Sequence, residues 1–374
     1  MLNQEKVFEK LISSGVEFFA GVPDSYLNGF CNYALKNYEE KNVMAANEGN
    51  AVGIAAGYYF ANKKLPLVYM QNSGLGNIVN PIASLVDENV YSVPMLLLVG
   101  WRGEPGTGDW PQHHLQGEIT TKLLDTLNIP YSILKDDIED FSAVIDKAVS
   151  YANESRKPYA LIAPKGVMAG EKSNDENNTY PMSREEAIEA TLDAMPADTI
   201  YSATTGRATR ELFFLRERRG ESKANDFLNV GSMGHASSVA LGIAMSKPER
   251  KVVVLDGDAA VIMHMGALTM VSKTDVPNLL HIVLNNGANE SVGGQPSAGY
   301  KIDFTKIAEA CGYNTVGWAV STKEELVDAI KKLSSENKPG FIEVRIHKGL
   351  RAPLPPLDFS HRKAIDELID NLNK

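Results

Sequence analysis

The chain has 374 residues, 44% hydrophobic and 22% charged, which is long enough for two globular domains and excludes a low-complexity protein. Its formal net charge of −10 argues against a general nucleic-acid-binding protein, because such proteins need basic faces to displace the counterions around phosphates. Only two cysteines occur, Cys31 and Cys311, so we expect no disulfide framework and a reducing compartment such as the cytoplasm.

The N-terminal residues 1–15 are typical of a charged amphipathic helix and do not have the continuous apolar core of a signal peptide. No apolar run reaches the length of about 20 residues that a membrane span needs. We therefore expect no membrane partner and no nucleic-acid partner.

Short apolar segments alternate with helical patterns along the chain, and each is predicted as a strand. These segments are residues 17–21, 43–46, 66–71, 94–99, 159–163, 199–202, 227–230, 251–255, 279–284, 314–318 and 340–346. Between them, residues 137–155 and 322–337 place apolar side chains at three- and four-residue spacing, which predicts amphipathic helices. Short apolar strands separated by helices predict an α/β fold whose parallel sheets are flanked by helices on both faces.

The polar residues 170–181 have almost no apolar side chains, so we interpret them as a linker between domains 1–169 and 182–374. Three features of the first half recur in the second, in the same order, at offsets between 181 and 186 residues. They are a Lys-Pro pair at 157 and 338, a strand at 65 and 251, and a small-residue helix at 48 and 233. The repetition predicts two domains of the same topology, and the small residues suit close helix packing at a domain or subunit interface.

Oxygen-bearing residues follow two neighbouring strands of the second half. Strand 251–255 leads into Gly257, Asp258, Ala259 and Ala260, and strand 279–284 leads into Asn286 and Ala288. Ligands bind where parallel strands end, and Mg²⁺ prefers a carboxylate, an amide oxygen and a backbone carbonyl such as these residues offer. The small residues would let backbone N–H groups approach phosphate oxygens. The alternative is a phosphate-free turn with an Asp N-cap and a turn-forming Asn pair.

Two further segments carry candidate binding residues. Glu48 is a lone carboxylate at the start of a small-residue helix, where a favourable helix dipole is the alternative explanation. Gly231, Ser232 and Met233 lie in a Gly-rich stretch, where a helix start with a core Met is the alternative.

Together these segments resemble the signature of thiamine diphosphate enzymes. The matching residues are Leu241-Gly242, Pro248, Val253, Leu255, Gly257 to Ala260 and Asn285-Asn286, with a spacing of 28 positions from Asp258 to Asn286. Ala259 departs from the pattern, where Gly is commonest. The resemblance implies thiamine diphosphate and Mg²⁺ as cofactors. Asp258, Asn286 and the Ala288 carbonyl would bind the metal ion, and residues 257–260 would bind the diphosphate.

The same resemblance assigns roles to Glu48 and Met233. Glu48 would hydrogen-bond N1′ of the aminopyrimidine, so that the 4′-imino group removes the thiazolium C2 proton. Met233, between Ser232 and Gly234, would hold the cofactor in a bent shape. The first half is then a pyrimidine-binding domain and the second a diphosphate-binding domain. Because the family's cofactor lies between Glu48 of one subunit and Asp258 of another, we expect a homo-oligomer, at least a dimer.

The two-domain arrangement and the segments GVPDSYL, GWRGEPGTGDWPQHHLQG and TTGRATRELF are similar to the phosphonopyruvate decarboxylase family. The resemblance implies a carboxy-lyase of phosphonate biosynthesis that converts 3-phosphonopyruvate into phosphonoacetaldehyde and CO₂. Sulfopyruvate decarboxylase, or another 2-keto-acid decarboxylase or carboligase of the family, is the alternative. A sensor or assembly module that kept the fold is a non-enzymatic alternative. A nicotinamide enzyme is disfavoured because no GxGxxG turn follows an early strand.

A small anionic 2-keto acid needs cationic or N–H donors. The candidates are Arg102, Arg207, Arg210, Lys301 and Arg351, although each could instead be a solvated surface residue. Asp24 and Ser25 are expected to begin a helix at the ligand-facing end of the first strand, with a simple N-cap as the alternative. His113 and His114 are expected in a loop over the active site, where one would relay a proton after CO₂ leaves, or else in an ordinary surface loop.

Overall fold

The structure is a computed structural model that describes residues 1–168, 170, 179–274, 276–349, 354, 355, 357 and 359–374. The chain divides into two compact units. The first contains Met1–Asn174 and Asn289–Gln295, and the second contains Asp175–Ala288 and Pro296–Lys374. The predicted linker at 170–181 falls mostly outside the described residues, so its bounds stay a prediction. No helix in the described part of the chain is long and apolar enough to cross a membrane.

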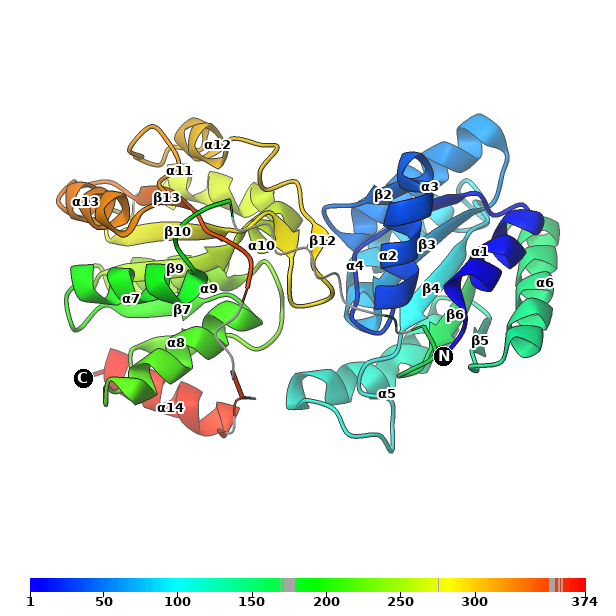
Figure 1. The fold of residues 1–374 in the computed structure, drawn as a ribbon, viewed down its shortest axis with the longest axis horizontal. Helices are drawn as coiled ribbons and strands as arrows, with labels where there is room; N and C mark the ends of the chain where they lie inside the picture. Colours follow the sequence, from blue (N-terminus) through cyan, green and yellow to red (C-terminus); the bar gives the residue numbers. More distant parts are fainter. Residues whose placement is uncertain (169, 171–178, 275, 350–353, 356, 358) are drawn as a thin grey trace. The chain divides into compact units, whose positions relative to one another are not determined.

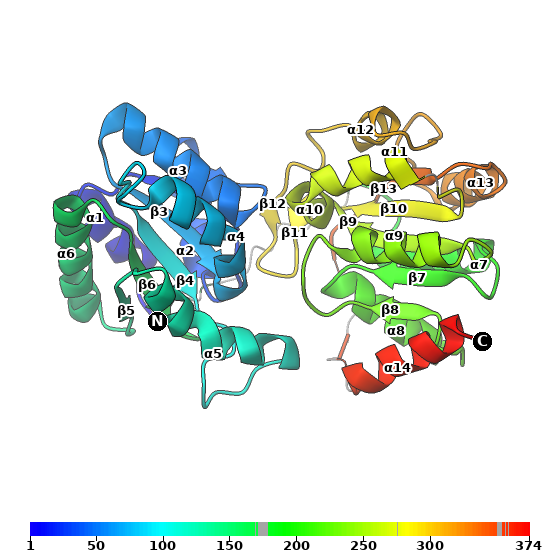
Figure 2. The same ribbon diagram turned by 180° about the vertical axis from the view of Figure 1, so that it is seen from behind.

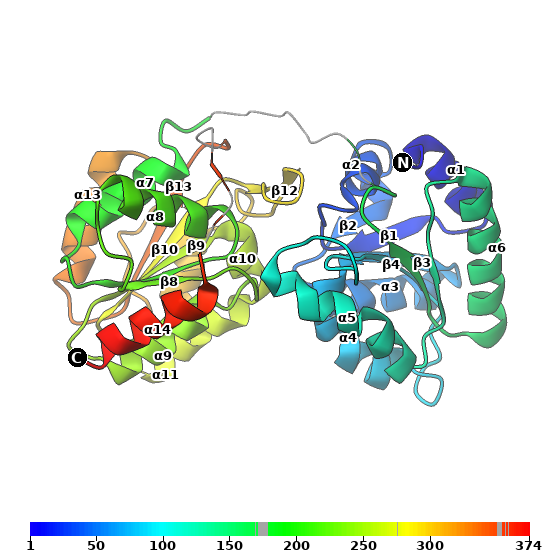
Figure 3. The ribbon, with the colours of Figure 1, turned by 90° about the horizontal axis from the view of Figure 1, so that it is seen from below.

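The first unit is built on a six-stranded, fully parallel sheet in the order β2-β1-β3-β4-β6-β5. Its strands are β1 (Phe18–Gly21), β2 (Asn42–Met44), β3 (Pro66–Gln71), β4 (Leu96–Gly100), β5 (Tyr131–Ile133) and β6 (Tyr159–Ala163). Helices cover both faces of this sheet, as Figure 3 shows for α2 on one side and α3 and α4 on the other. The helices are α1 (Gln4–Ser13), α2 (Asn28–Asn37), α3 (Glu48–Asn62), α4 (Leu75–Pro81), α5 (Pro111–Thr126) and α6 (Ile138–Ser155).

Two apolar cores lie against the two faces of the first sheet. Phe8 of α1, Phe30 of α2 and Ile145 of α6 belong to one core, whereas Ala55 of α3 and Ile78 of α4 belong to the other. Successive side chains of a strand point to opposite faces, so a strand buried on both sides must be apolar throughout. This explains why β3, β4 and β6 appear in the sequence as continuous apolar runs.

The second unit contains a five-stranded parallel sheet in the order β13-β10-β9-β7-β8. Its strands are β7 (Ile200–Ala203), β8 (Asp226–Leu228), β9 (Val252–Gly257), β10 (Leu279–Asn285) and β13 (Gly340–Arg345). A separate ribbon of β11 (Ala288–Asn289) and β12 (Gln295–Pro296) has residues in both units. The helices are α7 (Arg184–Ala194), α8 (Arg207–Arg218), α9 (Ala236–Ser246), α10 (Asp258–Met263), α11 (Val271–Thr274), α12 (Phe304–Ala310), α13 (Lys323–Ser334) and α14 (His361–Leu372) (Figure 1).

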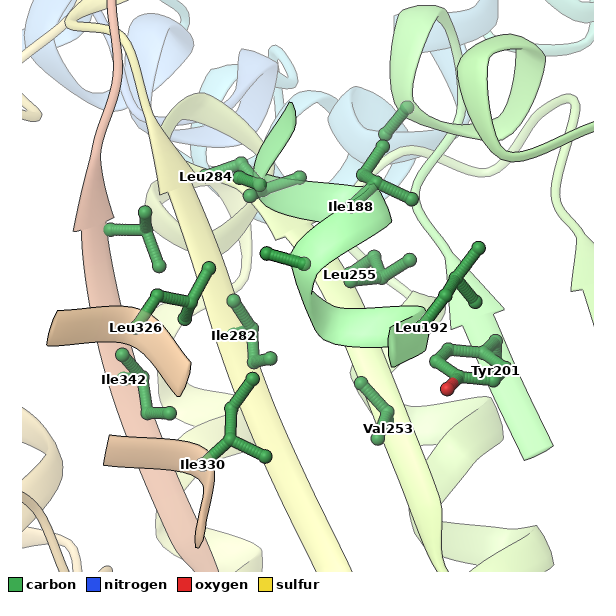
Figure 4. Packing of buried hydrophobic residues seen from close by; sticks show 14 of the residues in the cluster. Ile188, Leu192, Tyr201, Val253, Leu255, Ile282, Leu284, Leu326, Ile330 and Ile342 are labelled. Carbon is green, nitrogen blue, oxygen red and sulfur yellow. The ribbon is translucent and has the colours of Figure 1, made fainter. Parts of the chain in front are cut away.

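The second sheet is also packed on both faces. Figure 4 shows one core, in which Ile188 of α7 and Ile330 of α13 meet Leu255 of β9 and Ile282 of β10. The opposite face packs against α9, which Figure 2 shows in front of the sheet, and includes Val254 and Ala240. The prediction of parallel sheets flanked by helices is therefore confirmed.

The two units share one topology, as the repeated sequence features predict. In both sheets, the second strand of the unit lies at one side, followed by the first, third and fourth strands. The strand predicted at 314–318 is wrong, since this segment makes only an isolated bridge from Asn314 to Gly340 and then turns at Gly317, where φ is +91°. The sequence analysis missed β5, a short edge strand whose side chains are only partly buried.

Candidate functional site

In the first unit, four adjacent strand ends carry polar side chains to one edge of the sheet. Glu48 follows β2, Asp24 follows β1, Gln71 ends β3 and Arg102 follows β4. Ligands bind at such edges, because the loops between parallel strands and helices open there. This edge therefore holds the candidate residues of the first half.

Glu48 is the first residue of α3, and only 4% of its surface is exposed. The Asn47 side chain caps the helix by accepting a hydrogen bond from the Asn50 N–H at 2.9 Å. Asn77 Nδ2 donates to Glu48 Oε2 at 2.6 Å, and Gly74 lies so close that a Cβ there would overlap the Glu48 side chain. Burial raises the pKa of Glu48 above its ordinary value, although the hydrogen bond from Asn77 opposes this. This environment favours the protonated form of the carboxyl group more than water does.

Asp24 is completely buried, but it does not begin a helix as predicted. α2 begins at Asn28 with no side-chain cap, and Asp24 instead accepts the Tyr26 N–H at 3.0 Å in a turn before the helix. Gln71 Nε2 donates to the other carboxyl oxygen at 2.7 Å. Burial raises the pKa of Asp24, against the lowering effect of these hydrogen bonds and of Arg102. Asp24 is therefore a second buried carboxyl group at the same sheet edge.

Arg102 forms a bidentate ion pair with Asp109, at 2.8 Å from Nε and 2.7 Å from Nη2. Its Nη1 donates to Ser25 Oγ at 3.1 Å. The same Asp109 carboxylate lies 2.8 Å from His113 Nδ1, and its backbone carbonyl lies 2.9 Å from His114 Nε2. The prediction that both histidines lie in a loop is wrong. They occupy the first turn of α5, which begins at Pro111, a residue favoured at this position.

The sequence analysis missed Asp109. One signal was available, because Asp109 precedes His113 by four residues and stands just before a proline that can begin a helix.

In the second unit, four adjacent strand ends again supply the candidate residues. Asn286 follows β10, Asp258 follows β9, Thr204 follows β7, and the turn that contains Met233 follows β8. The spacing of the sequence motif therefore reflects a single edge of this sheet.

The predicted metal ligands are all buried: Asp258 is 2% exposed, Asn286 3% and Ala288 6%. Ser297 Oγ donates to Asp258 Oδ2, and the Asn286 side-chain oxygen accepts the Ala288 N–H at 3.1 Å. Burial raises the pKa of Asp258 to about 6, against the effect of Ser297 and of the backbone N–H groups of Asn286 and Ala259.

The described residues contain no cluster of three or more His, Cys, Asp or Glu side chains that could hold a metal ion. A cation at Asp258 would therefore combine one carboxylate with amide and carbonyl oxygens. Such a donor set fits Mg²⁺ that shares its remaining positions with phosphate oxygens.

Space for a diphosphate lies beside Gly257. A Cβ added at Gly257 would have only Thr204 Cγ2 nearby, at 3.9 Å, so a ligand can approach this backbone. Thr204 Oγ1 is buried and has no hydrogen-bond partner in the described part of the chain. It stands two residues before Gly206, which precedes α8 with a φ of +98° and provides no side-chain cap. The unused hydroxyl and the open helix N-terminus fit a phosphate group, and the sequence analysis did not identify Thr204.

Met233 lies in a tight turn, not at a helix start. Ser232 and Gly234 on either side of it have φ values of +49° and +82°, and α9 begins only at Ala236. Asn229 accepts the Gly231 N–H at 3.2 Å, which fixes the beginning of the turn. A Cβ at Gly234 would lie 2.6 Å from the His264 ring, so this position requires glycine. The turn holds a half-buried Met233 beside the start of α9.

The remaining cationic candidates differ in their surroundings. Arg207 is the first residue of α8 and is half-buried at the same sheet edge. Arg210 donates to the backbone carbonyls of Leu354 and Pro355, so its guanidinium is already engaged. Lys301 is exposed, and Arg351 lies outside the described residues.

Comparison with known proteins assigns two stretches of the chain to the same enzyme family. Residues 3–125 match the family model described as the N-terminal TPP binding domain of thiamine pyrophosphate enzymes. Residues 205–344 match the C-terminal TPP binding domain of the same enzymes. The chain belongs to the thiamine pyrophosphate enzyme family. Thiamine diphosphate is accordingly its cofactor, and the resemblance seen in the sequence is confirmed.

Within this family the chain is similar to decarboxylases. It is 33% identical to phosphonopyruvate decarboxylase of Streptomyces viridochromogenes, over 93% of this chain and 89% of the relative. It is 32% identical to phosphonopyruvate decarboxylase of Streptomyces hygroscopicus, over 95% and 90%. It is 29% identical to sulfopyruvate decarboxylase of Methanosarcina acetivorans, over 95% and 94%. The chain is thus a thiamine diphosphate-dependent carboxy-lyase.

The burial of Asp258 predicts opposite effects of one substitution on stability and on binding. Its pKa of about 6 in the folded chain, against 3.8 ordinarily, corresponds to about 3 kcal/mol of destabilisation at neutral pH. Because the folded pKa is the higher one, this destabilisation is present above pH 6 and fades as the pH falls towards 4. We therefore expect Asp258→Asn to raise the thermal midpoint of the cofactor-free protein at pH 7.5 and to change it little at pH 4.

The same substitution should weaken the joint binding of Mg²⁺ and thiamine diphosphate by at least about tenfold in calorimetry, because a charged ligand is lost. Asp328→Asn, at an exposed position on α13, is the matched control and should change neither quantity. A cofactor-free Asp258→Asn protein that melts lower than the parent at pH 7.5 would contradict this account of the buried charge.

Proposed function

We propose that the chain decarboxylates 3-phosphonopyruvate to phosphonoacetaldehyde and CO₂, with thiamine diphosphate and Mg²⁺, as a step of phosphonate biosynthesis. The identity of 33% over 93% of the chain to a phosphonopyruvate decarboxylase carries the proposal. The buried polar residues around Glu48 and around Asp258 support the proposal. The free thiols of Cys31 and Cys311 fit the reducing cytoplasm, where we place the enzyme.

The bound cofactor supplies an electron sink for the electrons that departing CO₂ leaves behind. The oxygens of Asp258, Asn286 and Ala288 would hold its metal ion, and the backbone at 257–260 its diphosphate. Met233 and the adjoining residues Gly231 and Ser232 would support its central part. Glu48 would share a proton with the pyrimidine ring, a role that suits a buried carboxyl group with a raised pKa.

Proton delivery after CO₂ leaves is assigned to the edge of the first sheet. Asp24 is a buried carboxyl group, and burial raises its pKa, which favours the protonated form. His113 presents its Nε2 atom, because its Nδ1 atom is bound to Asp109. His114 is more exposed and bonds to a backbone carbonyl, which makes it the weaker candidate of the pair. We propose that Asp24 is the source of the proton that replaces CO₂, and that Nε2 of His113 relays a proton by accepting it before passing it on.

Replacing Glu48 tests the catalytic role directly. We expect Glu48→Ala and Glu48→Gln to slow exchange of the cofactor C2 proton by at least about 100-fold, because neither side chain can share a proton. Cofactor affinity should fall less than about tenfold, since the metal site lies elsewhere in the chain. Proton exchange is measured by NMR after acid quench, and affinity by calorimetry. Glu118→Ala, at an exposed position on α5, should match the parent. Normal exchange in both Glu48 variants would refute this role of Glu48.

The substrate assignment requires a competition among keto acids. The enzyme with Mg²⁺ and thiamine diphosphate should show a kcat/KM for phosphonopyruvate at least about tenfold above those for sulfopyruvate and pyruvate. CO₂ release and aldehyde formation are both followed, so that carboligation is also detected. The 29% identity to a sulfopyruvate decarboxylase makes that activity the second candidate, and a higher value for sulfopyruvate would establish it instead.

We also propose that two copies of the chain complete each active site. Helices α3 and α9 expose small or apolar residues that permit close helix packing: Gly53, Ile54 and Gly57 on α3, and Val239 and Gly242 on α9. These are the two helices that the sequence repeat relates to each other. A homo-oligomer built through them would be at least a dimer.

Complementation between inactive variants tests this arrangement. Chains with Glu48→Ala and chains with Asp258→Ala should each be inactive alone. When they are coexpressed with different tags and purified as mixed dimers that carry both tags, about one half of the sites should regain both residues if each site joins two chains. Activity is measured against the parent at equal chain concentration. Mixed oligomers without activity would place each site within one chain.

A further inference from the structure

The Asp109 carboxylate collects an unusual number of hydrogen-bond donors. Its Oδ1 atom lies 2.7 Å from Arg102 Nη2, 2.8 Å from His113 Nδ1 and 2.7 Å from the Trp110 N–H. Its Oδ2 atom lies 2.8 Å from Arg102 Nε, 2.9 Å from the Gly103 N–H and 3.3 Å from the Tyr26 hydroxyl. Both oxygens are therefore saturated, and only 3% of the side chain is exposed.

These contacts decide what Asp109 can and cannot do. Burial opposes its ionisation, but the hydrogen bonds from Arg102 and His113 outweigh burial and hold the pKa of Asp109 far below its ordinary value. An anion whose lone pairs are all occupied can neither transfer a proton nor contact a substrate. Its effect must pass through the groups that it holds.

Arg102 is held in one orientation by three neighbours. Asp109 occupies the side of the guanidinium formed by Nε and Nη2, and the Tyr26 ring lies 4.8 Å from the guanidinium carbon. Nη1 donates to Ser25 Oγ, whose hydrogen then remains available to a ligand. In the described part of the chain, Ser25 is the only acceptor of Arg102 other than Asp109, so one N–H of Nη1 and one of Nη2 have no acceptor. These two N–H groups and the Ser25 hydroxyl suit the oxygens of a phosphonate or similar tetrahedral anion.

His113 is oriented by the same carboxylate. Because a carboxylate only accepts hydrogen bonds, Nδ1 of His113 carries the hydrogen, and the neutral ring has its lone pair on Nε2. Among the residues that the structure describes, Nε2 of His113 has no hydrogen-bond partner. The spacing between the edge of Arg102 and the reactive nitrogen of His113 is thus set by one residue.

We propose that Arg102 and Ser25 form the subsite for the anionic tail of the substrate, and that Asp109 is the positioning residue that couples this subsite to His113. The inference rests on the proposed function, since it assigns the phosphonate of phosphonopyruvate to this subsite. It explains how a keto acid bound by its tail would present its reacting carbon to a fixed proton carrier.

The kinetic test compares substitutions at Asp109, Arg102 and His113. Arg102→Gln should raise the KM for phosphonopyruvate at least about tenfold, whereas His113→Gln should mainly lower kcat. Asp109→Asn should do both, because it keeps the shape but loses the charge that holds both groups. The double variant Arg102→Gln/Asp109→Asn should have a KM within about twofold of Arg102→Gln alone. Asp125→Asn, at an exposed position on the same helix, is the control and should match the parent.

A merely structural role for Asp109 predicts a different pattern. Asp109→Asn would then lower the thermal midpoint and reduce turnover of phosphonopyruvate and of pyruvate by the same factor. KM effects of Asp109→Asn and Arg102→Gln that simply multiply would overturn the coupling through Arg102. An unchanged KM for phosphonopyruvate in Arg102→Gln would overturn the subsite itself.

Two measurements without turnover separate this inference from the proposed function. Methylphosphonate should bind the cofactor-loaded parent enzyme and bind Arg102→Gln at least about tenfold more weakly, as followed by ³¹P NMR titration. The ¹⁵N NMR spectrum should show His113 as the Nδ1–H tautomer in the parent and a shifted, mixed tautomer in Asp109→Leu. If phosphonopyruvate is not decarboxylated but both results hold, the subsite stands and the substrate assignment fails. If turnover occurs and methylphosphonate binds both proteins equally, the subsite is wrong.

Discussion

The burial of carboxyl groups at strand ends is the constraint on which the proposed site depends. Asp24, Glu48 and Asp258 are each at most 4% exposed, and in the described part of the chain none of them pairs with Lys or Arg at ion-pair distance. Burial raises the pKa of all three. A raised carboxyl pKa destabilises the folded chain above that pKa. The apolar cores on both faces of the two sheets must offset this destabilisation. The fold thereby shields these carboxyl groups from water, in which their pKa values would return to the ordinary range.

The repeated topology explains how two different half-sites arise from one plan. Asn72 follows the third strand of the first sheet, and Asp258 follows the third strand of the second. Glu48 begins the helix after one second strand, and Met233 lies just before the helix after the other. One edge therefore carries two buried carboxyl groups with raised pKa values, and the other carries the residues predicted to bind a metal ion. The two sheet edges differ because they carry different side chains on the same topology, since fold alone does not determine function.

The sequence predicted best what depends on short stretches of chain. β3 and β6 were placed to the residue, because a doubly buried parallel strand must be apolar throughout. The local spacing also placed Gly257, Asp258 and Asn286 at neighbouring strand ends of one sheet, where the structure has them. Segment 314–318 was misassigned because its β-branched and aromatic residues suit a strand, whereas only Val316 is buried and Trp318 is exposed in a loop. Thr204 and Asp109 were not predicted as site residues, because their interest depends on the groups that lie beside them in the folded chain. An unpartnered hydroxyl and a six-donor carboxylate become visible only when the loops are placed in space.

The pairing of Arg102 with Asp109 bears on selectivity between anions. A free guanidinium would attract any anion through its charge, but here that charge is largely offset by a carboxylate within 2.8 Å. The attraction that remains is short-ranged and directional, through the N–H groups at one edge and the Ser25 hydroxyl. Because such bonds require acceptor oxygens, they favour an oxyanion tail over a methyl group. A phosphonate carries more negative charge than a sulfonate and is therefore the stronger acceptor. The compensated arginine thus supports selectivity through hydrogen-bond strength and geometry.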